Sequence, residues 1–91
     1  MVKVLLNLFL VNPKITPFVY RIVEYLEIKK EASLSQIQYY IKCSLSRVVT
    51  ILEKLKSLNI ITNKGNLAVL LVSQEEALKI ISDNEAVFEN V

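Results

Sequence analysis

Histidine and tryptophan are absent from this chain, and glycine and cysteine occur once each, as Gly65 and Cys43. With one cysteine and no histidine, one copy can form no internal disulfide, zinc finger or cysteine–histidine nucleophile pair. A single glycine excludes a glycine-rich phosphate loop. The nine acidic residues show no paired catalytic pattern. We therefore expect a protein that is not an enzyme, with no metal and no cofactor, and no small-molecule ligand is evident.

The chain also lacks a large excess of positive or negative charge. It has eleven basic and nine acidic residues, which give a formal net charge of +2. A strongly basic chain would indicate a nucleic-acid partner by composition alone. Here an argument for DNA binding has to come from the positions of the charges along the elements.

The chain is apolar for its size, with 53% hydrophobic residues among 91 and a mean hydropathy of +0.41. This length fits one domain, and the composition predicts additional apolar surface hidden in an interface. The apolar run over residues 2–11 is too short to span a bilayer as a helix. It also lacks the basic lead and the cleavage site of a signal peptide. We expect an intracellular, cytoplasmic protein without a membrane partner, and the lone thiol fits a reducing compartment.

Four helices are predicted from caps and apolar spacing. Thr16 and Pro17 start a helix that runs to about Lys30. Ser33 and Gln36 form a capping box, which opens a short helix over residues 34–42. After a tight break, Ser44 caps a helix that ends at Asn59, whose side chain tolerates the left-handed conformation. A final capping pattern over residues 73–76 opens the last helix.

Strands are predicted at both sides of this helical core. The β-branched run over residues 2–11 favours a buried strand. Residues 60–72 indicate a hairpin, with Gly65 supplying the positive φ of the turn. We therefore predict a helix-dominated α+β fold in one domain, residues 1–91. Its parts are an N-terminal strand in 1–14, a helical core in 15–62, a hairpin in 60–73 and a C-terminal helix in 74–91.

A short helix, a tight turn, a longer helix and a hairpin follow one another over residues 34–72. The segment from Ser44 to Ile61 opens with small polar residues, continues with leucines, and closes with an apolar pair that enters the hairpin. This stretch resembles the winged-helix domain of MarR- and ArsR-type transcription regulators. Asn59 stands where those families usually have glycine, a mild departure. The resemblance implies a helix-turn-helix whose second helix lies in the DNA major groove, with the hairpin as the wing.

The outward face of the 44–59 helix supplies the candidate DNA contacts. Arg47 can fork onto a guanine edge, and the hydroxyl side chains can donate to phosphates or bases. Val49 fits either a thymine methyl contact or burial, while Glu53 would repel phosphate. The predicted DNA-binding residues are Ser44, Ser46, Arg47, Val49, Thr50, Lys54 and Lys64.

The leading hypothesis is a small transcription regulator that binds double-stranded DNA sequence-specifically. The predicted homodimer uses the apolar strands and the C-terminal helix, including Leu78, Ile81, Val87 and Phe88. The alternative is a winged-helix adaptor that binds protein and not DNA, favoured by the mild charge, Val49 and Glu53. A redox role for Cys43 is the third hypothesis. Tyr39 and Tyr40 are expected to pack in the core, although one hydroxyl could touch a phosphate.

Overall fold

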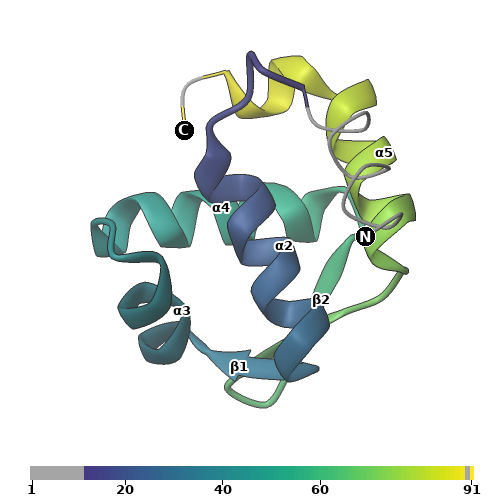
Figure 1. Ribbon diagram of the computed structural model, residues 1–91. Helices are drawn as coiled ribbons and strands as arrows, with labels where there is room; N and C mark the ends of the chain where they lie inside the picture. Colours follow the sequence, from purple (N-terminus) through teal and green to yellow (C-terminus); the bar gives the residue numbers. More distant parts are fainter. Residues whose placement is uncertain (1–11, 90) are drawn as a thin grey trace.

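The computed structural model describes residues 12–89 and 91. Figure 1 shows its helices packed together, with the small sheet at the lower edge of the molecule. The elements are α2 (Pro17–Lys29), β1 (Glu31–Ser33), α3 (Leu34–Ile41), α4 (Leu45–Ser57), β2 (Ile61–Lys64), β3 (Leu67–Leu70), α5 (Gln74–Asp83) and the 3₁₀ helix η1 (Glu85–Phe88). The predicted helix-dominated α+β class is therefore confirmed for this part of the chain. Residues 2–11 of the predicted N-terminal strand lie outside the described residues, and Pro13 and Lys14 form a turn rather than its end.

Serine caps fix the starts of three helices. At α3 both halves of the predicted capping box are present, because Ser33 Oγ accepts from the Gln36 amide and Gln36 Oε1 accepts from the Ser33 amide. Ser44 and Ser73 each accept from the backbone amide three residues later, at the starts of α4 and α5. Such caps satisfy amides that the helix itself leaves unpaired. Thr16 occupies the predicted cap position of α2 but makes no side-chain cap bond there.

A left-handed residue makes the sharp turn between α3 and α4. Lys42 has φ 59° and ψ 48°, and its amide donates to the Gln38 carbonyl at 2.8 Å. Only Cys43 and Ser44 separate this cap from the first residue of α4. The predicted break at residues 43–44 is confirmed. Asn59 likewise has φ 60° after α4, as predicted for its end.

The three strands form an antiparallel sheet in the order β1-β3-β2. The hairpin turn is Gly65-Asn66, and of these two only Gly65 has a positive φ, 64°. This is the pattern of a type II′ turn, which matches the twist of the flanking strands. β1 was not predicted; it pairs Ala32 with Ala68 and brings the start of α3 against the hairpin.

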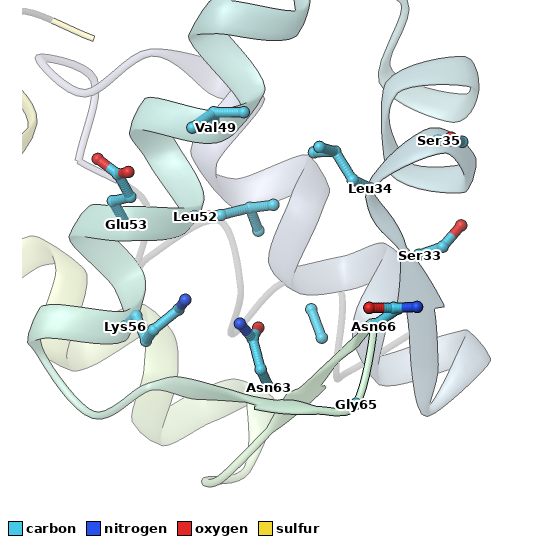
Figure 2. Close-up of a pocket in the computed structure, with 11 residues that line it drawn as sticks. Ser33, Leu34, Ser35, Val49, Leu52, Glu53, Lys56, Asn63, Gly65 and Asn66 are labelled. Carbon is cyan, nitrogen blue, oxygen red and sulfur yellow. The ribbon is translucent and has the colours of Figure 1, made fainter.

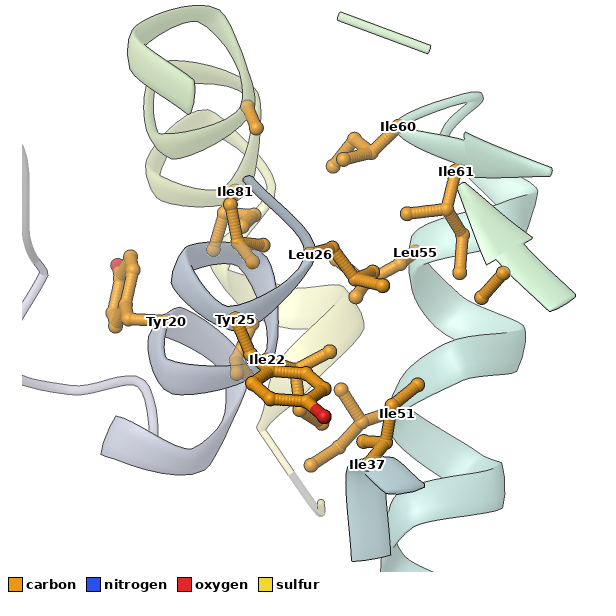
Figure 3. Close-up of a cluster of buried hydrophobic side chains, with 14 of the residues drawn as sticks. Tyr20, Ile22, Tyr25, Leu26, Ile37, Ile51, Leu55, Ile60, Ile61 and Ile81 are labelled. Carbon is orange, nitrogen blue, oxygen red and sulfur yellow. The ribbon is translucent and has the colours of Figure 1, made fainter. Parts of the chain in front are cut away.

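The core lies between α2, α4, α5 and the inner face of the sheet (Figure 3). Ile22 and Leu26 of α2 and Ile51 and Leu55 of α4 have no exposed surface. Phe88 of η1 closes the cluster at 1% exposure. The apolar stripe of α4 is buried in this core, so the opposite side of the helix faces solvent. No helix of the described residues has the length and apolar character needed to cross a membrane.

Candidate nucleic-acid interface

The outer side of α4 is the surface that the sequence singles out. Ser44, Ser46, Arg47 and Lys54 are exposed, and Thr50 is half-buried. At 100° per residue, the buried Val48 and the exposed Ser46 lie on opposite sides of the helix. The predicted orientation of α4 is therefore confirmed by the burial of its side chains.

Hydroxyl groups gather at the first turn of α4. Ser44 Oγ accepts from the Arg47 amide at 3.3 Å and lies 3.4 Å from Ser46 Oγ. Thr50 Oγ1 donates to the Ser46 carbonyl at 2.8 Å, so its proton is engaged by its own helix. These four residues line a shallow polar hollow of about 250 Å³, together with Val91. The hollow places hydroxyls, a guanidinium and the positive end of a helix dipole on one surface.

Arg47 leans toward α2 rather than straight outward. Its guanidinium carbon lies 5.5 Å from the centroid of the Phe18 ring, within cation–π range. Such a contact at an exposed site is worth roughly 0.5–1 kcal/mol. Phe18 therefore holds the guanidinium on one flank of α4, and a base contact would have to compensate for the loss of this contact.

Lys54 continues the same flank. With Thr50 and Ser57 it lines a second hollow of about 480 Å³, whose other wall comes from Ala86, Val87 and Val91. The flank of α4 that carries Arg47 and Lys54 thus borders η1 and the segment after it, and not the hairpin.

The other flank of α4 faces the hairpin across a groove of about 420 Å³ (Figure 2). Val49, Glu53 and Lys56 line it from α4, and Asn63 and Asn66 line it from the hairpin. In Figure 2 the Lys56 side chain extends toward Asn63, while the Glu53 carboxylate points away from the hairpin. We name this space the hairpin groove.

The predicted residues are therefore divided between two flanks. Ser44, Ser46, Arg47 and Thr50 come together in one hollow, whereas Val49 lies in the hairpin groove. Lys64 is exposed at the end of β2, next to the hairpin turn.

No family model, curated protein or solved structure matches this chain. The argument about function therefore depends on the geometry of α4 and its neighbours.

Sequence reasoning missed two kinds of residue that line the hairpin groove. Asn63 and Asn66 fall within the predicted hairpin and are not among the predicted DNA-binding residues, yet both line the groove. Ser33 and Ser35 also line it, because β1 brings the start of α3 beside β3. The signal available in the sequence was the pair of asparagines around Gly65; nothing local indicated the position of Ser35.

The described residues contain no group of three or more cysteine and carboxylate side chains able to hold a metal ion. Cys43 is half-buried in the turn before α4 and packs against the core. The surface around α4 thus offers hydroxyls, amides and cations, which are groups that donate hydrogen bonds to phosphate and base edges.

Proposed function

We propose that this chain binds double-stranded DNA sequence-specifically as a small transcription regulator of the winged-helix type. In this proposal α3 and α4 are the helix-turn-helix, α4 is the recognition helix and the β2–β3 hairpin is the wing. The observation that carries the proposal is the uncovered outer side of α4, where Ser46, Arg47 and Lys54 are exposed. The exposed hairpin beside it, with Lys64, supports a second contact.

The two flanks of α4 suggest different contacts. On one flank, Arg47 is long enough to fork onto a guanine, with Ser44 and Ser46 beside it for phosphate or base oxygens. On the other flank, Val49 offers an apolar contact to a thymine methyl, and Glu53 accepts from a cytosine amino group. The carboxylate of Glu53 is compatible with a duplex only if it meets such a donor, since phosphate repels it.

A homodimer remains part of the proposal, through a smaller surface than the sequence predicted. Leu78, Ile81 and Phe88 are 2%, 0% and 1% exposed within one copy, so they belong to its core and are not available to a mate. Of the predicted surface, Val87 is half-buried, and the outer face of β3 remains, where Leu67 and Val69 are half-buried and are followed by Leu71 at 52% exposure. Mass in solution, measured by light scattering, tests this dimer.

The DNA proposal is tested by polarisation titrations of duplexes selected from a random library, at two salt concentrations. Arg47→Ala is expected to lower the discrimination between the selected and a scrambled duplex by about 5- to 150-fold, the worth of one bidentate base contact. Lys64→Ala is expected to weaken both duplexes alike and to reduce the salt slope by about 1.

Lys79→Ala is the matched control, because Lys79 is an exposed cation on α5, an element that lines neither flank of α4. Its binding should equal that of the unaltered chain. Absence of binding to every duplex at low salt would overturn the proposal and leave the adaptor hypothesis. An equal loss in Lys79→Ala would show that only net charge matters.

A further inference from the structure

Two large side chains on the α2–α3 side of the molecule are left in solvent. Tyr39 is 84% exposed and Ile28 is 64% exposed, and Tyr40 beside them is 41% exposed. The expectation that Tyr39 and Tyr40 pack in the core is therefore wrong. At 100° per residue, Tyr39 lies 160° away from both Ile37 and Ile41, which enter the core, whereas Tyr40 lies 60° from Ile37, at the margin of the buried face. Exposed aromatic side chains that gather in one place are typical of an interaction surface.

These side chains enclose a groove between two helices. Tyr25, Ile28 and Lys29 of α2 form one side, and Gln36, Tyr39 and Tyr40 of α3 form the other, around about 490 Å³. We name this space the aromatic groove.

The aromatic groove is built on a fixed base. The rings of Tyr25 and Tyr40 stack with centroids 4.4 Å apart and planes 24° from parallel. Tyr25 is only 8% exposed and belongs to the core cluster. Because the stack ties Tyr40 to a buried ring, the groove exists without a ligand, which lowers the entropy lost on binding.

The charged residues at the aromatic groove are positive. Lys29 is the one charged residue among the described residues that line the groove. A second hollow of about 610 Å³ adjoins it at Ser35 and Tyr39 and contains Lys42, again with no carboxylate in its lining. The two hollows together present an apolar, aromatic centre with a lysine toward each end.

We propose that the aromatic groove binds an acidic segment of another protein. An apolar or aromatic side chain of that segment enters between Ile28 and Tyr39, and its carboxylates meet Lys29 and Lys42. Tyrosine suits this role because its ring packs against apolar atoms while its hydroxyl stays in water. An amphipathic helix or a short extended segment can supply such an anchor.

The charges and apolar walls of the groove disfavour two other occupants, a second copy of this chain and a DNA duplex. A second copy docked through the same groove would bring the lysines of both copies together, with no carboxylate in the groove lining to neutralise them. A DNA duplex meets apolar walls here rather than a row of cations. None of the groove residues belongs to α4 or to the hairpin, although Ser35 lines both this groove and the hairpin groove, so the site is adjacent to the proposed DNA contact and uses other anchors.

The probe for the test is a short fluorescein-labelled peptide with a leucine and a phenylalanine one helical turn apart, flanked by glutamates. Two control peptides replace its glutamates with lysines, or its two apolar residues with serines. Amide spectra of the ¹⁵N-labelled chain should shift in the second half of α2 and in α3. Polarisation should show that the acidic peptide binds more tightly than both controls.

Variants of the exposed walls complete the test. Tyr39→Ser is expected to weaken the acidic peptide about tenfold, as for loss of one anchor, with unchanged DNA binding. Ile28→Ser repeats the test on the opposite wall if Tyr39→Ser fails to fold. Lys29→Glu should weaken the acidic peptide and strengthen the lysine peptide, whereas Lys79→Glu should change neither.

Three results would overturn the proposal. One is the absence of spectral shifts at the groove with every peptide. Another is equal affinity for the acidic and basic peptides. The third is conversion of a dimer into a monomer by Tyr39→Ser, which would identify the occupant as a second copy of this chain.

Discussion

Lys30 ends α2 in a backbone conformation that suits glycine. Its φ is 71° and its ψ is −42°, and its side chain is exposed. A residue with a Cβ in this sparsely populated region costs roughly 1–3 kcal/mol. Replacement by glycine removes this cost, but glycine also increases the entropy of the unfolded chain, which offsets part of the gain. Lys30→Gly is therefore expected to raise the free energy of unfolding by about 0.5–1 kcal/mol. Urea denaturation followed by circular dichroism measures the change.

The control for this prediction is the same replacement inside a helix. Lys79 is also exposed but lies in the middle of α5. Lys79→Gly should lower the free energy of unfolding by about 1 kcal/mol, because glycine is a poor helix former. A loss of stability in both variants would mean that Lys30 is not strained.

Tyr20 joins the start of the described chain to the last turn of α5 through one hydroxyl. Its Oη accepts from the Asn12 amide at 2.8 Å and lies 3.4 Å from Ser82 Oγ. Tyr20→Phe keeps the ring and removes these bonds, so the free energy of unfolding should fall by about 1 kcal/mol. Thermal unfolding monitored by calorimetry tests this value. A stability equal to that of the unaltered chain would show that water replaces the hydroxyl at no cost.

The β2–β3 hairpin depends on the backbone conformation of one residue, Gly65. Gly65 has φ 64°, and a Cβ built on it meets no atom within 4 Å. Gly65→Ala should therefore cost about 1–2 kcal/mol for conformation alone, with no contribution from crowding. Asn66→Ala, at the next position of the turn, is the matched control and should cost less. Chemical denaturation of both variants makes the comparison, and an equal cost would contradict the assigned turn.

The elements that the sequence predicts correctly are those with a local signal. Ser33, Ser44 and Ser73 were identified as caps, and each accepts the expected backbone amide. β1 had no such signal, because its three residues include a single apolar side chain, Ala32, and only Lys30 separates them from α2. It is a strand because β3 pairs with it, a tertiary interaction that propensity does not contain.

The same limit applies to the candidate site. Helical periodicity fixed which side of α4 faces solvent, because Val48, Ile51 and Leu55 form one stripe. It did not show that the hairpin borders one flank and η1 the other, since that depends on how distant segments pack. Tyr39 and Tyr40 were misplaced for a related reason. Tyrosine is intermediate in burial, so its type alone does not decide its position, and a short helix offers the core only one face.

For the molecule as a whole, the C-terminal segment is part of the core rather than an appendage. Phe88 is 1% exposed and lies in the cluster shared by α2, α4 and α5. Phe88→Ala should lower the free energy of unfolding by about 3–5 kcal/mol, a large share of the stability of a domain this small. Leu71→Ala, at a 52% exposed position, is the control and should change it by about 0.5 kcal/mol or less. Equal losses in urea denaturation would contradict the described core.

The place of β3 in the sheet has a consequence for self-assembly of the chain. Residues 67–72 carry only apolar, mostly branched side chains, the composition from which amyloid spines form. β3 lies between β1 and β2, so both of its hydrogen-bonding edges are occupied within the fold. The outer strands are short, and β2 ends in Asn63 and Lys64, which discourage growth by strand addition. The three residues of β1 thus occupy one hydrogen-bonding edge of β3. Loss of this pairing would leave that edge free to pair with a strand of another chain.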